Sequence, residues 1–91
     1  MKLEFAIDKR DRFWEVKVYV LESIFDDEIL FEEPLDEAQY KRIGDWCAIV
    51  FRTQNHPYRA RRMSFDSYWF ASKRDLDWFI LHWSGVDSDA V

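Results

Sequence analysis

The sequence predicts a small α+β domain, in which an antiparallel sheet of three or four strands packs against two helices in the order ββ(β)αβα. Alternating apolar residues in the first part of the chain, two later segments with helical spacing, and an aromatic content of 19% support this fold class. A length of 91 residues fits one domain. We expect that domain over residues 1–85, with residues 86–91 as a flexible tail.

The two N-terminal strands are predicted by period-two alternation. Residues 2–7 and 13–21 each place apolar side chains at every second position, with Val16 and Val18 on the same side of the second segment. The polar residues 8–12 are typical of a turn, so the two segments predict an antiparallel hairpin.

A third strand and the first helix follow. The short apolar run 29–31 is compatible with a strand that ends before Pro34. Residues 35–51 predict a helix, with Asp36 as its cap and Gln39 at the reciprocal capping-box position. Its apolar stripe has the spacing i, i+3, i+4, i+7 and consists of Ile43, Trp46, Cys47 and Val50.

The C-terminal part predicts one strand and one helix. Residues 58–71 form an extended stretch with aromatic residues on both faces. Ser72 can cap the following helix, with Asp75 at its third position, and Ser84 and Gly85 end it. The apolar stripe of this helix consists of Leu76, Phe79, Ile80 and Trp83.

Charge is segregated along the chain, whose net charge is −5. Residues 22–37 contain acidic residues and no basic ones: Glu22, Asp26, Asp27, Glu28, Glu32, Glu33, Asp36 and Glu37. Residues 52–74 contain six basic residues against Asp66 alone: Arg52, Arg59, Arg61, Arg62, Lys73 and Arg74. Such runs are usually solvated faces, and charged strand edges also prevent aggregation.

The acidic segment suggests a function beyond solvation. Spaced carboxylates imitate nucleic-acid phosphates, so they can dock on a basic surface of a protein that handles nucleic acid. The residues that we expect to make this contact are Glu22, Asp26, Asp27, Glu28, Glu32 and Glu33. The partner would then be a basic, nucleic-acid-handling protein.

The basic segment supports an alternative. Arg59, Arg61 and Arg62 are interleaved with aromatic residues, a combination that binds single-stranded nucleic acid through phosphate contacts and base stacking. The negative net charge argues against this alternative.

The aromatic excess indicates that some rings lie on the surface. Trp78 falls outside the apolar stripe of its helix, and Tyr68 lies in a stretch with rings on both faces. Tyrosine and tryptophan contribute heavily to binding energy in interfaces. We therefore expect Tyr68 and Trp78 to contact a partner.

The sequence contains no strong catalytic motif, and we expect neither an enzyme nor a cofactor. Cys47 is typical of a buried apolar residue, while His56 and His82 are scattered, so no metal site is predicted. Asp11, Glu15 and Lys17 resemble the charged set of a metal-dependent nuclease, which is the weakest alternative.

The segment from Ser64 to Trp83 resembles the C-terminus of small tailed-phage accessory proteins. Those proteins end in an aromatic strand, an Asp near a helix start and a Phe-x-Leu-x-Trp helix, to which Asp75 and the run from Phe79 to Trp83 correspond. This chain has Leu76 where the family has a small residue. The resemblance implies a phage protein, made in the bacterial host cytoplasm, that inhibits a host nucleic-acid-handling or defence protein in the manner of an anti-CRISPR.

The remaining expectations concern compartment and assembly. No apolar run approaches the length of a membrane span, and a single cysteine suits a reducing cytoplasm. A homodimer through strand edges or exposed rings is compatible with the sequence.

Overall fold

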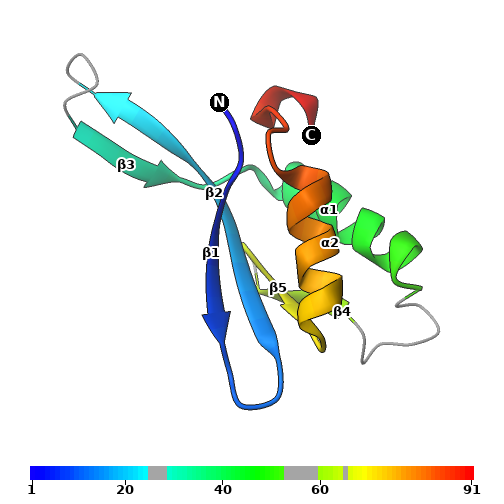
Figure 1. Cartoon of the computed structure of the whole chain (residues 1–91). Helices are drawn as coiled ribbons and strands as arrows, with labels where there is room; N and C mark the ends of the chain where they lie inside the picture. Colours follow the sequence, from blue (N-terminus) through cyan, green and yellow to red (C-terminus); the bar gives the residue numbers. More distant parts are fainter. Residues whose placement is uncertain (25–28, 53–59, 65) are drawn as a thin grey trace.

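The computed structural model describes residues 1–24, 29–52, 60–64 and 66–91, except the side chains of residues 24 and 61–63. Within these residues, the elements follow one another as β1 (Glu4–Lys9), β2 (Trp14–Ile24), β3 (Ile29–Glu33), α1 (Glu37–Val50), β4 (Ala60–Ser64), β5 (Ser67–Phe70), α2 (Lys73–Trp83) and the 3-10 helix η1 (Ser88–Ala90) (Figure 1). The predicted α+β fold class is confirmed.

The long strand β2 is the centre of the sheet. Its first half pairs antiparallel with β1 and with β5, and β4 continues the sheet beyond β5, which gives the order β1-β2-β5-β4. Residues 20–24 of β2 pair with β3 instead. The expected alternation is confirmed, because Val16, Val18 and Val20 are buried while Glu15 and Lys17 on the other face are partly exposed.

The single strand expected over residues 58–71 is instead two strands. β4 and β5 pair antiparallel, with Ala60 opposite Phe70, and the chain turns at Asp66 between them. The backbone N–H of Val18 donates to the carbonyl of Asp66, which fixes this turn against β2. The turn at Asp66 was not predicted, because alternating apolar residues continue on both sides of it and make the whole stretch look like one strand.

Both helices begin as the sequence predicts. Asp36 caps α1 in a complete capping box with Gln39, and the Ser72 hydroxyl accepts a hydrogen bond from the N–H of Asp75 at the start of α2. The stripe positions Ile43, Cys47, Leu76, Phe79 and Trp83 are buried, and Trp46, Val50 and Ile80 pack partly buried against them.

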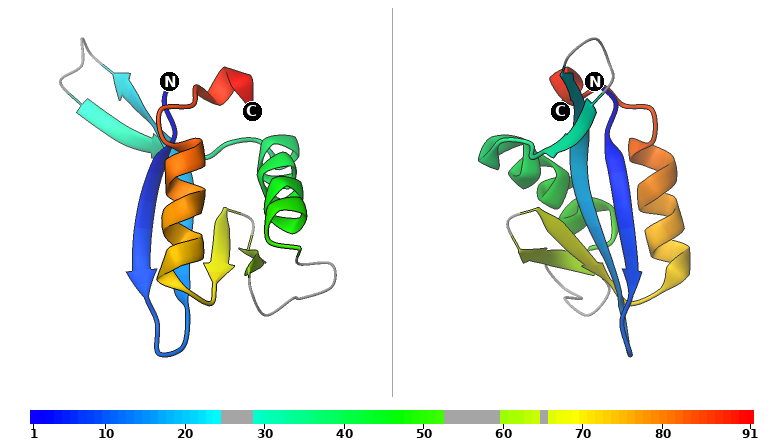
Figure 2. Two further views of the ribbon diagram at one scale, coloured as in Figure 1. Left: turned by 45° about the vertical axis from the view of Figure 1, so that its right-hand side comes forward. Right: turned by 90° about the vertical axis from the view of Figure 1, so that its left-hand side faces the viewer.

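The two helices contact each other and pack against the sheet (Figure 2). The core between the helices and the sheet is made of rings: Phe79 of α2 lies 5.0 Å from Phe70 of β5, centroid to centroid, and Phe51 lies 5.6 Å from the same ring. Trp46 of α1 stacks on His82 of α2 at 4.3 Å. Edge and tilted ring contacts of this kind add to the stabilisation from burial alone.

Residues 86–91, expected to form a flexible tail, are packed in the structure. The N–H of Leu3 donates to the carbonyl of Val86 at 3.1 Å, and the N–H of Ser88 donates to the carbonyl of Met1 at 2.7 Å. Gln39 of α1 donates to the carbonyl of Ser88 at 2.7 Å. Composition alone suggested a loose end, whereas these hydrogen bonds join the segment to both the N-terminus and α1.

Candidate functional site

The acidic segment builds a projecting arm, which we define as residues 20–24 of β2 together with β3. Beyond the buried Val20 at its base, the arm extends away from the helices (Figures 1 and 2). Val20 pairs with Glu33, and Glu22 pairs with Phe31. The arm is therefore a two-stranded ribbon, an arrangement that has little stability on its own in water.

One face of the arm continues the core-facing side of β2. Side chains alternate along a strand, so Glu22 shares the face of the buried Val20, and cross-strand partners share it too. This face carries Ile29, Phe31 and the two carboxylates of Glu22 and Glu33. Ile29 is 51% exposed and Phe31 is half-buried, so apolar surface stays open between carboxylates.

The opposite face of the arm carries Leu30 and Glu32, of which Leu30 is 59% exposed. Isolated exposed apolar side chains are common, but here they occur on both faces of one projecting ribbon. Asp26, Asp27 and Glu28, which we also expect in the contact, lie outside the described residues.

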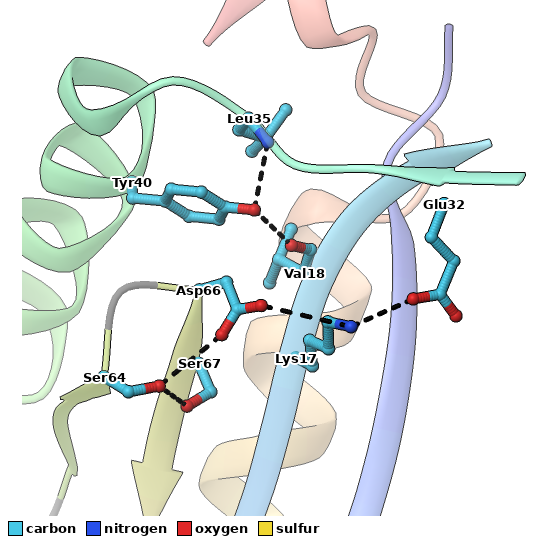
Figure 3. A network of polar contacts seen from close by, with 8 residues as sticks. All are labelled: Lys17, Val18, Glu32, Leu35, Tyr40, Ser64, Asp66 and Ser67. Atoms are coloured by element: carbon cyan, nitrogen blue, oxygen red, sulfur yellow. Dashed lines mark hydrogen bonds and ion pairs between the residues drawn. The ribbon is translucent and has the colours of Figure 1, made fainter. Parts of the chain in front are cut away.

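A network of polar contacts fixes the base of the arm (Figure 3). Lys17 donates to Glu32 at 2.9 Å and lies 4.0 Å from Asp66, and this hydrogen bond to Glu32 is the main cause that raises the pKa of Lys17. The Tyr40 hydroxyl donates to the carbonyl of Val18 at 2.8 Å and accepts from the N–H of Leu35 at 3.0 Å. These contacts join β2 to the segment that links β3 and α1, so the direction of the arm is set at its base.

A hollow of about 350 Å³ lies between the end of α1 and the start of α2. We call it the interhelical hollow, and it is lined by Val50, Phe51, Arg74, Asp75 and Trp78. Trp78 is 49% exposed, as expected for a ring outside the apolar stripe of its helix. A half-exposed tryptophan beside a hollow is a typical contact residue for a partner.

Tyr68, the other ring expected at the surface, is fully buried. Its hydroxyl donates to the carbonyl of Tyr40 at 2.7 Å, and its ring packs against Phe79 at 5.6 Å. The expectation of a surface role for Tyr68 is therefore wrong. Val16 lies opposite Tyr68 in the sheet, so the pairing with β2 turns Tyr68 toward the core.

The structure only partly locates the basic segment. Arg59 lies outside the described residues, and for Arg61 and Arg62 only the backbone in β4 is described. Arg52 and Arg74 are both exposed, and within the described part of the chain neither has an ion-pair partner.

Potentially reactive groups are placed as follows. Cys47 is buried, and this burial raises the pKa of its thiol to about 12, so the thiol stays neutral at physiological pH. His82 is exposed and stacked on Trp46, and His56 lies outside the described residues. Among the described residues, no group of three His, Cys, Asp or Glu side chains is placed to hold a metal ion.

The charged set that resembles a nuclease is engaged in other contacts. Glu15 accepts from Arg10 at 3.0 Å, and Lys17 is held by Glu32. Asp11 lies exposed in the turn between β1 and β2. The geometry thus gives Glu15 and Lys17 roles in surface ion pairs.

Sequence reasoning missed two features of these surfaces. The strand β2 runs on to Ile24, beyond the expected end at residue 21, and this extension creates the arm. The interhelical hollow also went unnoticed, because it depends on how the two helices approach each other. The exposed Trp78 was the one sequence signal for it.

Comparison of the chain with protein-family models, curated proteins and solved structures found no match. Within the described residues, neither helix has the length and apolar character needed to cross a bilayer.

Proposed function

We propose that this protein is a non-catalytic binding module that attaches through its arm to a basic surface of a nucleic-acid-handling protein. The observation that carries the proposal is the projecting ribbon with open apolar side chains between carboxylates. Covering Ile29 and Phe31 removes apolar surface from water, while Glu22 and Glu33 supply the charge that a basic surface attracts.

The proposed consequence of binding is inhibition. Nucleic acid gives up condensed counterions when its phosphates bind a basic surface, and the arm's carboxylates would contact the same cationic side chains. The arm and nucleic acid would then compete for one surface. The finer proposal is a phage-encoded inhibitor that acts on a host defence protein in the bacterial cytoplasm, and its support is the resemblance of residues 64–83.

The test compares an arm variant with a matched control in a bacterial lysate. The arm variant is Glu22→Lys with Glu33→Lys. The control is Asp11→Lys with Asp89→Lys, which makes the same change in net charge at exposed positions away from the arm. We expect wild type and control to retain the same basic protein at low salt and to release it at high salt, while the arm variant loses it.

A second step tests inhibition. The retained protein, once purified, should lose bound nucleic acid when wild type is added, measured by fluorescence anisotropy of a labelled oligonucleotide. Retention of the same proteins by the arm variant would refute the role of the arm. Retention of nucleic acid alone would instead favour the alternative that uses residues 52–74, with Arg59→Ala, Arg61→Ala and Arg62→Ala as its diagnostic variants.

A further inference from the structure

The strand β3 forms an outer edge of the arm (Figure 1). It pairs antiparallel with residues 20–24 of β2 and with no other strand in the described part of the chain. Every second residue of such a strand points its N–H and C=O groups away from the paired neighbour, which leaves a row of groups able to pair with a further strand. No other backbone hydrogen bond between described residues involves residues 29–33. The edge of β3 is therefore open to another extended chain.

The open edge of β3 is regular. Its register with β2 is continuous over five residue pairs, and Pro34 follows the strand instead of interrupting it. By contrast, the register of β4 with β5 shifts between Arg62 and Ser64, and irregularities of this kind protect an edge from further pairing. The outer strand β1 carries charged residues of both signs, whereas the charges of β3 are all negative. The edge of β3 therefore repels acidic chains and attracts basic ones.

The side chains along β3 define the chemistry of a strand that can pair with it. Ile29, Phe31 and Glu33 lie on the face of the arm that continues the core-facing side of β2, which we call the core-side face. Glu33 forms no ion pair with another described residue, whereas Glu32 on the other face is held by Lys17. A strand laid antiparallel along this edge therefore matches it with a basic residue opposite Glu33 and apolar residues opposite Phe31 and Ile29.

The same pattern disfavours a second copy of this chain at the edge. Two β3 strands that pair antiparallel about a two-fold axis at Phe31 would place Glu33 of each copy opposite Ile29 of the other. No carboxylate would then gain a cation, and the acidic arms of two copies would approach each other. An extended basic segment of another protein avoids both costs.

We propose that the arm binds its partner by strand addition, in which an extended basic segment of the partner pairs antiparallel with β3 and becomes the third strand of the arm. Backbone hydrogen bonds supply the affinity of such a contact, and alternate side chains supply its selectivity. A third strand also relieves the marginal stability of a two-stranded ribbon. This inference rests on the proposed function, because it names the form in which the basic partner meets the arm.

A synthetic peptide tests strand addition on the purified protein. The probe is Thr-Lys-Thr-Val-Thr-Val-Thr, which places lysine opposite Glu33 and the valines opposite Phe31 and Ile29. Two further versions carry backbone N-methyl groups, one on the lysine and valines and the other on the threonines between them. Only every second N–H of the probe faces β3, so one version should bind like the parent and the other should bind roughly tenfold more weakly or worse. Titration followed by nuclear magnetic resonance measures the affinities.

Amide hydrogen exchange locates the contact. Binding should protect every second N–H of β3, on the side away from β2, and should leave β1 unchanged. No binding at millimolar probe, equal weakening by both methylation patterns, or protection of β1 or of residues 20–24 instead of β3 overturns the proposal. Protection of β3 that rises with protein concentration in the absence of probe would mean pairing between copies and would also overturn it.

The substitution Glu33→Lys tests the selectivity of the edge. The variant should bind the probe roughly threefold more weakly or worse, and it should prefer a probe that has glutamate in place of lysine. The matched control is Asp11→Lys, which makes the same change in charge at an exposed position in the turn between β1 and β2. Near-ultraviolet circular dichroism checks that both variants are folded. The same probe preference in both folded variants would contradict the role of Glu33.

The outcome separates this inference from the proposed function, because the probe experiments use purified protein and no lysate. Failure of the probes together with salt-sensitive retention of a basic protein through the arm would reject strand addition and leave the function standing. Probe binding at β3 without any protein retained from the lysate would keep β3 as a strand-binding edge and reject the function.

Discussion

At the scale of single residues, Tyr40 joins three parts of the molecule. Its ring is buried, and its hydroxyl bonds the backbone of Val18 and Leu35 (Figure 3). Its own carbonyl accepts from the hydroxyl of Tyr68. Val18 belongs to the central strand and Leu35 to the link into α1. One phenol therefore satisfies two backbone groups that no strand pairing reaches.

Replacing Tyr40 with Phe tests this role. The ring volume is kept, but a buried N–H and a buried carbonyl lose their partner, which should cost about 1–3 kcal/mol of unfolding free energy. Urea denaturation measures the change. The matched control is Tyr19→Phe, at a half-exposed residue in β2, which should change stability by less than about 0.5 kcal/mol. Equal effects of the two substitutions would contradict the role of the Tyr40 hydroxyl.

Some residue-scale placements could be predicted from the sequence, and others could not. Cys47 lies within the apolar stripe of α1, and Trp78 lies outside the apolar stripe of α2. The burial of Cys47 and the exposure of Trp78 therefore followed from helical spacing. Tyr68 did not, because both faces of its strand carry rings and a period of two does not show which face meets the helices. That choice is made by Val16, which lies across the sheet from Tyr68.

At the scale of elements, capping chemistry predicted the helix starts and a glycine marks one helix end. Gly85 follows α2 with a φ of 80°, in the left-handed region that side chains disfavour. A Cβ built there meets nothing within 4 Å, so a substitution would strain the backbone without a clash.

This geometry predicts a graded effect at Gly85. Gly85→Ala should lower the unfolding free energy by about 1 kcal/mol, since alanine tolerates a positive φ poorly. Gly85→Asn should cost less, because asparagine adopts this region more readily. Thermal denaturation of both variants measures the difference. Identical melting temperatures for the alanine variant and wild type would show that the helix ends differently in solution.

The arm shows why element boundaries are hard to predict. Alternation identified β2 only as far as residue 21, because Glu22 and Ser23 interrupt the apolar pattern. The strand continues to residue 24 because its backbone pairs with β3, although the side chains of Glu22 and Ser23 are no longer buried. The sequence therefore predicted the acidic composition of the candidate site but not its projecting shape.

At the scale of the whole molecule, the last six residues join the C-terminal end of the chain to its N-terminal end. Asp87 accepts from the N–H of Asp89, which is the main cause that lowers its pKa, and it also pairs with the N-terminal ammonium group at 3.1 Å. A group with a lowered pKa contributes stability above its unfolded value, and this contribution is lost as pH falls through the folded value. The contacts of Asp87 therefore stabilise the protein less at acidic pH, where this carboxylate becomes protonated.

Deleting residues 86–91 tests whether the segment is part of the fold. The deletion removes the hydrogen bonds to Met1, Leu3 and Gln39, and should lower the unfolding free energy by about 1–3 kcal/mol. Chemical denaturation of the shortened protein measures the loss. The control is deletion of Val91 alone, which removes its contact with Arg42, its hydrogen bond to Ser88 and its partial packing on the core, and leaves the hydrogen bonds to Met1, Leu3 and Gln39. An unchanged stability after the longer deletion would restore the expectation of a flexible tail.

The closure between the chain ends has a consequence for synthesis. The Lys2 side chain donates to the carbonyl of Gly85, 83 residues later, so the segment before β1 cannot complete its contacts until that residue has been synthesised. At translation rates of roughly 5–20 residues per second this interval is roughly 4–17 s, during which the N–H of Leu3 lacks its partner, the carbonyl of Val86. The contacts of residues 1–3 therefore form only after residues 85–88 have been synthesised, and a premature stop before Gly85 would leave β1 paired with β2 but residues 1–3 without these partners.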